Sequence, residues 1–264
     1  MKIALMQMDI AWCDERENIA RAEQMVATSP SAELYVLPEM WSTGFVIEAQ
    51  DVARTEQESE ALAWMCRTAK TRDCAVAGSL VIREGERYFN RLYFVTTEGI
   101  LARYDKYHLF RWGGETKRFT AGSERVVVEW RGVRFLLQVC YDVRFPAFSR
   151  NRMTESGAEY DVAIYVASWP TERLEVWQKL VMARAIENQA YVVAVNRTGT
   201  DAYCDYSGGS ICVDGLGDMV ADAAMRTGIV VADVDIIPLR ELRRRFPTLR
   251  DADEFTLRLR GKAE

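Results

Sequence analysis

The run "YDVAIYVASW", residues 160–169, decides the fold class. It is almost continuously apolar, as expected of a strand that is covered on both faces. Pro170 and Thr171 follow it directly and are typical of a helix start. The predicted helix carries apolar residues at helical spacing, and these are Leu174, Trp177, Val181 and Ala185. The run 190–197, "AYVVAVNR", then predicts another strand, so this half of the chain indicates an α/β sheet covered by helices.

The same succession opens the chain. Residues 2–8 and 33–38 are apolar runs of strand length, and between them lie three apolar residues near helical spacing, Ile19, Ala22 and Val26. A second helix leads into the run 74–82 and carries Leu62, Met65, Cys66 and Ala69. Turn residues predict hairpins around 97–99 and 131–132. Helices that alternate with strands and hairpins predict a layered α/β sandwich.

The composition favours one globular domain over residues 1–264. The chain is 49% hydrophobic, and no Pro/Gly/Ser-rich stretch divides it. A net charge of −5 argues against nucleic acid or an anionic membrane as the main partner. No apolar run reaches membrane-spanning length and no cleavage site follows the first residues, so we expect a cytoplasmic protein. His108 is the only histidine and the six cysteines lack ligand spacing, so we expect free thiols and neither a metal nor another cofactor.

Cys140 stands at an unusual position in "LLQVCYDVRFPAF", residues 136–148. The predicted strand 133–139 ends there, and Asp142 and Pro146 indicate a helix start soon after. A side chain on a tight strand-to-helix turn is pushed outward, and a nearby helix N-terminus favours the thiolate. A cysteine is more often a small buried hydrophobe, but this position predicts a nucleophile.

Glu39 and Lys106 also follow predicted strands. Glu39 emerges among apolar residues in "YVLPEMWSTGF", residues 35–45, where loss of water makes a carboxylate a better base. Lys106 ends the strand in "LARYDKYHLF", residues 101–110, and could stabilise an oxyanion. Taken singly, each could be an ordinary surface residue.

The combination of three motifs is more specific. In their order and separation, "LPEMWSTGF" (37–45), "YDKYHLF" (104–110) and "CYDVRFP" (140–146) resemble the nitrilase superfamily of carbon–nitrogen hydrolases, most closely its omega-amidase branch. The resemblance covers nearly the whole chain and implies a four-layer αββα sandwich. It makes Glu39 the general base, Lys106 the oxyanion-stabilising cation and Cys140 the nucleophile. It also implies a homodimer or larger assembly, with the C-terminal tail, about 238–264, in the interface.

The family pattern adds a second glutamate between the lysine and the cysteine. In "FRWGGETKRFTAGSE", residues 110–124, this residue would be Glu115, with Glu124 as the alternative. The omega-amidase resemblance implies small 2-oxo acid amides as substrates, such as 2-oxoglutaramate and 2-oxosuccinamate. Their terminal amide would be hydrolysed to the acid and ammonia through a cysteine thioester.

Such a substrate needs partners for both of its ends. The main-chain N–H of Tyr141 would share the oxyanion with Lys106. The terminal carboxylate needs a forked cation, for which Arg144 and Arg173 are the candidates by position, although Arg144 could instead pair with Asp142. Two aromatic side chains after strand ends could form the apolar walls, Phe45 and Trp169.

Three alternatives remain open at this point. His108 follows Lys106 by two residues, so on an extended strand the two share a side and His108 could be the base of a Cys–His dyad. Another activity of the same superfamily, on N-carbamoyl amino acids, nitriles or other amides, would use the same chemistry. The scaffold could also serve as a non-catalytic binding module.

Overall fold

Two six-stranded sheets form the body of the protein, in a computed structural model that describes residues 1–259. The first sheet has the order β16-β1-β2-β3-β4-β5. Its strands are β1 (Lys2–Gln7), β2 (Leu34–Val36), β3 (Ala75–Glu84), β4 (Arg87–Thr96), β5 (Gly99–Asp105) and β16 (Gly228–Asp233). Strands β1, β2 and β3 are mutually parallel, whereas β16, β4 and β5 join by antiparallel pairing.

The second sheet has the order β15-β14-β11-β10-β7-β6. Its strands are β6 (Val127–Trp130), β7 (Val133–Val139), β10 (Val162–Val166), β11 (Tyr191–Val195), β14 (Ile211–Val213) and β15 (Met219–Asp222). Strands β7, β10 and β11 are parallel. Two short hairpins stand apart from the large sheets, β8 (Met153–Thr154) with β9 (Gly157–Ala158) and β12 (Thr198–Thr200) with β13 (Asp205–Ser207).

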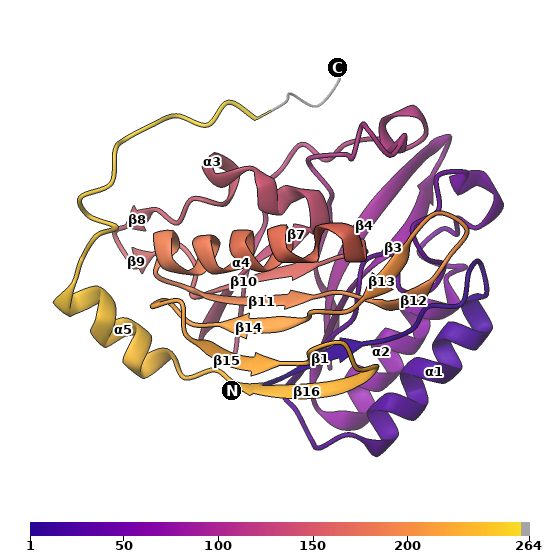
Figure 1. Cartoon of the computed structure of the whole chain (residues 1–264), viewed down its shortest axis with the longest axis horizontal. Helices are drawn as coiled ribbons and strands as arrows, with labels where there is room; N and C mark the ends of the chain where they lie inside the picture. Colours follow the sequence, from indigo (N-terminus) through magenta and orange to yellow (C-terminus); the bar gives the residue numbers. More distant parts are fainter. Residues whose placement is uncertain (260–264) are drawn as a thin grey trace.

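Five α-helices accompany the sheets within the described residues, and Figure 1 shows α1 and α2 on one side of the molecule and α4 on the other. The helices are α1 (Glu15–Thr28), α2 (Glu60–Arg72), α3 (Pro146–Ser149), α4 (Leu174–Asn188) and α5 (Ile236–Arg245). Each long helix covers the outer face of one sheet, α1 and α2 that of the first sheet and α4 that of the second. The predicted four-layer αββα sandwich is confirmed.

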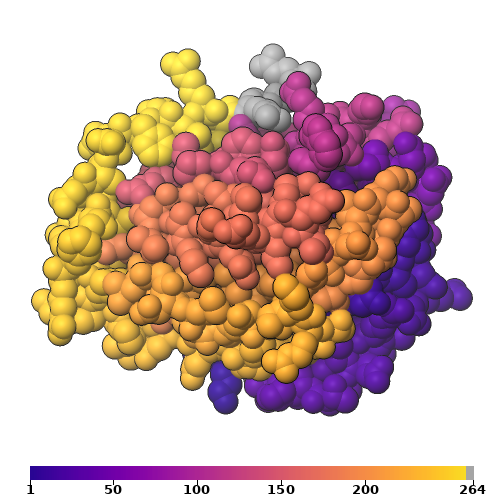
Figure 2. All heavy atoms as spheres, viewed as in Figure 1, coloured from indigo at the N-terminus to yellow at the C-terminus, as the bar shows by residue number. Residues whose placement is uncertain are grey.

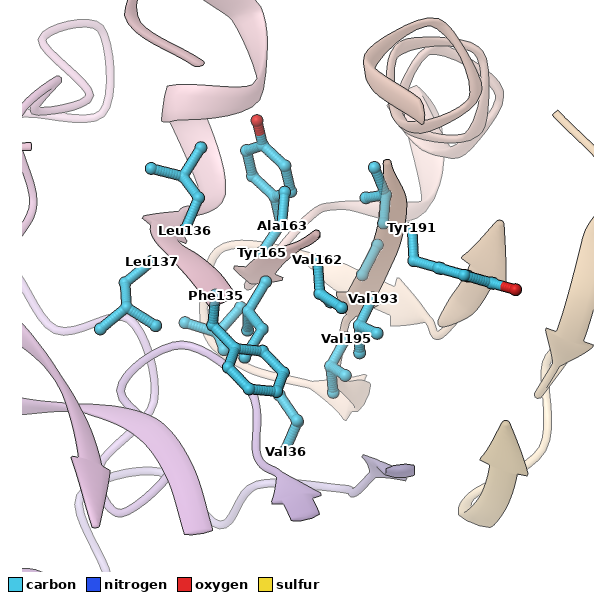
Figure 3. Close-up of a cluster of buried hydrophobic side chains, with 14 of the residues drawn as sticks. Val36, Phe135, Leu136, Leu137, Val162, Ala163, Tyr165, Tyr191, Val193 and Val195 are labelled. Carbon is cyan, nitrogen blue, oxygen red and sulfur yellow. The ribbon is translucent and has the colours of Figure 1, made fainter. Parts of the chain in front are cut away.

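The strand alternation explains the layers. On β1, Ile3 and Leu5 enter the core between the two sheets, and Ala4 and Met6 pack under α1 and α2. Figure 3 shows the core between the sheets, where side chains of β7 and β10 lie above Val36 of β2. Every residue of β10 is buried, as the apolar run 160–169 predicted.

Local signals place the element ends. The Ser59 hydroxyl accepts the Leu62 N–H and caps α2, which ends at Asp73 in a left-handed conformation. The hairpin between β6 and β7 turns at Arg131 and Gly132, both with positive φ, as a two-residue turn requires. The hairpins predicted at 97–99 and 131–132 are both present.

Two expectations need correction. The run 33–38 forms a strand only over Leu34–Val36: the Leu37 N–H still donates to Ala77 of β3, but Pro38 has no N–H with which to continue the ladder. After Cys140 the chain forms a 3₁₀ turn, Cys140–Arg144, and then the four-residue helix α3. Such short helices sum few peptide dipoles, so the N-terminal field expected to favour the thiolate is weak.

The C-terminal tail lies along the outside of the molecule, and Figure 2 shows it in yellow on the flank opposite the indigo N-terminal elements. Arg243 of α5 donates to the Asp161 carboxylate at 2.7 Å and to two main-chain oxygens, which fixes α5 on its own chain. Of the predicted interface segment 238–264, residues 260–264 lie outside the described residues. Residues 249–256 and 150–153 line a hollow of about 690 Å³, which contains none of the predicted site residues. Within residues 1–259, no helix is long and apolar enough to cross a membrane.

Candidate active site

Segments that follow strands of both sheets meet at one point. Glu39 follows β2 and Lys106 follows β5 of the first sheet, whereas Cys140 follows β7 and Ser168 follows β10 of the second. The Glu39 N–H donates to the Ala167 oxygen at 3.4 Å, and the Ser168 hydroxyl donates to the Glu39 oxygen at 3.2 Å. The carboxyl ends of the strands therefore bring these distant parts of the sequence together.

Lys106 lies between two buried carboxylates. Its Nζ is 2.7 Å from Oε1 of Glu39 and 2.9 Å from Oε2 of Glu115, and none of the three side chains is exposed. Glu115 begins a 3₁₀ turn, Glu115–Lys117, and its Oε2 also accepts the Phe110 N–H at 2.6 Å. Glu124, the alternative second glutamate, is exposed, so the glutamate in contact with Lys106 is Glu115.

The Glu39 carboxylate is held on several sides. Oε1 accepts from Lys106 and from Nδ2 of Asn90 at 2.8 Å, and Oε2 accepts the Ser168 N–H at 2.9 Å. The carboxylate also lies near enough to Cys140 for its charge to raise the pKa of that thiol. Glu39 is thus fixed in position beside the thiol whose proton it would accept.

The electrostatics of the cluster follow from its burial. Burial alone would lower the pKa of Lys106, but the carboxylates of Glu115 and Glu39 outweigh it and raise that pKa above its usual value. Burial raises the pKa of Glu115, which the ammonium of Lys106 opposes and the charge of Glu39 reinforces. Two carboxylates and one ammonium give the cluster a surplus of negative charge whenever both acids are ionised.

Cys140 occupies a strained turn at the end of β7. Its φ of 45° is in the left-handed region, which residues other than glycine seldom adopt, and the residue is 9% exposed. Burial and the Glu39 charge raise the pKa of the thiol well above its ordinary value, and Lys106 and the Ser168 N–H offset this only in part. A helix N-terminus was expected to favour the thiolate, but burial beside an acid shifts the pKa of this sulfur in the opposite direction.

His108 binds a different acid. Its Nδ1 is 2.8 Å from Oδ1 of the fully buried Asp142, and its ring stacks on Phe145 with centroids 3.7 Å apart. The second oxygen of Asp142 accepts the Tyr104 hydroxyl at 2.7 Å and the Val139 N–H at 2.8 Å. His108 therefore links the segment after Lys106 to the turn that carries Cys140.

The predicted substrate residues surround this point. The Phe45 ring centroid is 5.4 Å from Nζ of Lys106. The Arg144 guanidinium lies 4.9 Å above the ring of Trp169, and the oxygens of Asp142, its alternative partner, accept other donors. Trp169 is buried, and its Nε1 donates to the main-chain oxygen of Arg173 at 2.8 Å.

The outer rim of the site is aromatic. The Arg173 guanidinium lies 6.0 Å from the ring of Trp112, which is 85% exposed. The half-buried ring of Tyr141 packs against Phe110 at 5.1 Å. Arginines and aromatic rings therefore border the approach to the buried charges.

Sequence reasoning missed Asn90, Ser168 and Asp142 as parts of the site. Asn90 had one signal: it shares a face of β4 with Leu92 and Phe94, where a polar residue is out of place. Ser168 lies in the quoted run 160–169 but contributes a main-chain N–H, which carries no sequence signal. Within the described residues, no three His, Cys, Asp or Glu side chains are placed to hold a metal ion.

Comparisons with known proteins agree with this geometry. The chain matches the carbon–nitrogen hydrolase family over residues 2–244. It is 40% identical over 259 residues to omega-amidase YafV of Yersinia enterocolitica, covering 97% of this chain and 98% of that protein. It is 36% identical to the 2-oxoglutaramate amidase of Bacillus subtilis, covering 94% of this chain and 96% of that protein.

A solved structure is similarly close. It is that of XC1258 from Xanthomonas campestris, a CN-hydrolase superfamily protein with an arsenic adduct in its active site. The TM-score is 0.93 at 38% identity, and the match covers 97% of this chain and 98% of that chain. The buried cluster of two glutamates, a lysine and a cysteine therefore lies in a chain that belongs to the carbon–nitrogen hydrolase family.

Proposed function

We propose that the protein is an omega-amidase, which hydrolyses the terminal amide of small 2-oxo acid amides to the acid and ammonia. 2-Oxoglutaramate and 2-oxosuccinamate are the substrates that we infer. One observation carries the proposal: the buried Lys106 lies 2.7 Å from the Glu39 carboxylate, and the charges of both groups act on the thiol of Cys140. Similar proteins named omega-amidase and 2-oxoglutaramate amidase support the choice of amide.

Acylation begins from a protonated thiol. Because the pKa of Cys140 is raised, Glu39 takes the thiol proton as the sulfur attacks the amide carbon. A carbon–sulfur bond forms and the carbonyl electron pair moves to the oxygen. Lys106 and the main-chain N–H of Tyr141 would stabilise this oxyanion, whose charge is largest in the tetrahedral intermediate.

The intermediate then collapses. The carbonyl re-forms and the carbon–nitrogen bond breaks, while Glu39 returns its proton to the nitrogen so that ammonia leaves a thioester. In the second half, Glu39 takes a proton from water as the water oxygen attacks the thioester carbon. The carbon–sulfur bond breaks, the sulfur recovers a proton from Glu39 and the acid departs.

Glu115 has a supporting part in this scheme. Its carboxylate contacts the Lys106 ammonium and accepts the Phe110 N–H, so it ties the lysine to the 110–115 segment. A second anion on Lys106 also keeps the ammonium protonated, because it raises the pKa of that group. We propose that Glu115 positions Lys106 and is not itself the proton carrier.

The substrate carboxylate would bind near Arg144. The guanidinium of Arg144 lies over the Trp169 ring, and its donors would form a fork with a carboxylate. Arg173 follows Trp169 closely in the chain, and Phe45 and Trp169 would form apolar walls. A substrate with a carboxylate at one end and an amide at the other would thus be oriented toward Cys140.

Ammonia release from a panel of compounds tests the proposal. The panel holds 2-oxoglutaramate, 2-oxosuccinamate, N-carbamoyl amino acids and nitriles, each with wild-type protein and with Cys140→Ala as the blank. We expect the oxo-amides to give the highest kcat/KM. A preference for a nitrile or a carbamoyl compound would show that the protein has another activity of the family and is not an omega-amidase.

Intact-mass measurement separates enzyme from binding module. An acyl adduct on Cys140 after brief mixing with an oxo-amide is expected, because the thioester lies on the reaction path. Absence of an adduct and of ammonia with every amide would favour the non-catalytic scaffold.

We also propose a cytoplasmic homodimer or larger homo-oligomer, with the tail from about 238 in its interface. Phe246, which is 63% exposed, is one apolar residue that a second copy could cover. Light scattering of the full chain and of a chain that ends at residue 245 tests the tail. An unchanged mass after truncation would exclude residues 246–264 from the interface.

A further inference from the structure

Asn90 joins the two buried carboxylates of the site. Its side chain is fully buried, and its Nδ2 donates to Oε1 of Glu39 at 2.8 Å and to Oε1 of Glu115 at 3.1 Å. An amide nitrogen carries two hydrogens, so each carboxylate receives one. The reverse orientation would place the amide oxygen against two carboxylates, and this repulsion fixes the direction of the side chain.

The main chain of Asn90 binds the third member of the cluster. The Lys106 N–H donates to the Asn90 oxygen at 2.9 Å, beyond the last paired residues of β4 and β5. Asn90 also pairs with Val81 of β3 in the middle of the sheet, where the backbone is held on its other side. One residue of a central strand therefore contacts Glu39, Lys106 and Glu115 together.

The charges explain why an amide suits this position. Two carboxylates share one ammonium here, so a positive side chain in place of Asn90 would compete with Lys106, and a negative one would add a third acid. An apolar side chain would leave both acids without a donor in a buried place. Asparagine supplies two donors and no charge, at the point where both carboxylates can accept.

We propose that Asn90 is a positioning residue of the amidase reaction: its two amide N–H groups hold the Glu39 and Glu115 carboxylates against Lys106, with Glu39 directed at Cys140. This inference rests on the proposed function, but it also applies to the unliganded protein. Asn90 touches neither the thiol nor the substrate in this scheme. Its effect passes through Glu39.

The pH dependence of the reaction reports this effect. Four titratable groups face one another from four segments, and these are Glu39, Lys106, Glu115 and Cys140. The Ser168 N–H is an uncharged donor to Glu39. Donors to a carboxylate favour its ionised form, so removal of the Asn90 donors favours protonation of the carboxylates that accept them. The acid limb of activity then moves upward, whereas a purely structural loss lowers activity equally at every pH.

Asn90→Leu and Asn90→Asp test the proposal together. The leucine variant removes both donors at similar volume, and the aspartate variant keeps the shape but adds a third acid. Asn151→Leu is the matched control: Asn151 is also a buried asparagine whose side-chain nitrogen donates twice, but to main-chain oxygens remote from the acids. Melting temperature is measured for each variant to follow the fold.

Two pH profiles are recorded for each protein. The first is kcat/KM for 2-oxosuccinamate, and the second is the rate at which iodoacetamide alkylates Cys140, which needs no substrate. In both profiles, we expect the midpoint of the acid limb to lie about one pH unit higher in Asn90→Leu than in wild type, and higher still in Asn90→Asp. The control Asn151→Leu should have a lower melting temperature than wild type, but the acid limb of its two profiles should stay at the wild-type pH.

Several results would overturn the inference. These are an acid limb that stays at its wild-type pH in both Asn90 variants, an equal shift in Asn151→Leu, and loss of the fold in both Asn90 variants. The alkylation profile keeps this test separate from the proposed function. If the wild-type protein released no ammonia from any oxo-amide, the proposed omega-amidase function would be wrong. The acid limbs of the alkylation profiles would still decide the role of Asn90.

Discussion

Nζ of Lys106 lies 2.7 Å from Oε1 of Glu39, and neither side chain is exposed to solvent. Glu115 contacts the same ammonium on another side. A buried ion pair adds little to stability when compared with apolar residues of the same volume, but loss of one partner leaves a charge without compensation. The pair is therefore best explained by its chemistry, and its removal has a measurable cost.

Lys106→Met should show this cost. Two carboxylates would remain buried without a cation, so we expect the free energy of unfolding to fall by about 3–5 kcal/mol at pH 7. The loss should shrink at pH 5, where the acids can take protons. Urea unfolding at both pH values measures it, with the exposed Lys179→Met as the control. An equal loss at both pH values would contradict the account.

Glu115→Gln should separate stability from activity. Burial raises the pKa of Glu115, so the folded state holds this proton more tightly than the unfolded state. The stability that results is fully present below the unfolded pKa and is lost as the pH rises through the folded pKa. Glu115→Gln has no carboxyl group to titrate here, so it lacks this loss of stability. The melting temperature of the variant minus that of wild type should therefore rise from pH 4 to pH 7. Ammonia release by the variant should be lower than that of wild type. A difference that stayed constant across this range would refute the linkage.

Cys140→Ala should remove nearly all turnover and leave the fold intact. The nucleophile has no substitute within the cluster, whereas the loss of one sulfur at a 9% exposed turn changes packing little. Ammonia release, intact mass and melting temperature are the measurements. Cys66→Ala, a change at a half-buried cysteine on α2, is the matched control and should retain both turnover and the acyl adduct. An adduct on the Cys140→Ala protein would place the nucleophile elsewhere.

His108→Asn decides between the two bases. His108 bonds Asp142, so the change should cost about 1 kcal/mol of stability and reduce turnover modestly through the Cys140 turn. Alkylation of Cys140 should continue. Abolished alkylation together with abolished turnover would instead favour the Cys–His dyad.

Arg144→Met should weaken the binding of only those substrates that carry a carboxylate. A hydrogen bond to a charged group contributes about 1.5–3 kcal/mol, so KM for 2-oxosuccinamate should rise by about 10- to 100-fold. Turnover of a neutral amide such as propionamide should change little, because it has no carboxylate to lose. Arg173→Met is the paired variant. A larger rise in KM in that variant would place the carboxylate site at Arg173 and not at Arg144.

The sequence predicted the layers well because hydrophobic periodicity follows burial directly. The run 160–169 indicated a strand covered on both faces, and β10 is buried throughout. It predicted strand ends for Glu39, Lys106 and Cys140 because apolar runs stop there. Contacts between segments that follow different strands could not be read from it, since the bridge made by Asn90 depends on the order of the strands in the first sheet.

The surroundings of the thiol could not be read from the sequence. A strand followed by Asp142 and Pro146 predicted a helix start, and α3 does begin at Pro146, but it has only four residues and follows a 3₁₀ turn. The pKa of Cys140 is set mainly by burial and by the nearby Glu39, and both arise only when the sheets pack. Local sequence predicts where the sulfur lies relative to the strand, but not which groups surround it in the folded protein.

A raised thiol pKa also has a bearing on oxidative damage. Peroxides react with thiolates far faster than with thiols, so a sulfur that stays protonated between turnovers is a poor target for sulfenic acid formation. Many cysteine enzymes store a reactive anion and lose activity in air. Burial beside Glu39 favours the protonated form of this sulfur, so we expect the resting protein to survive hydrogen peroxide at concentrations that inactivate enzymes whose resting cysteine is a thiolate.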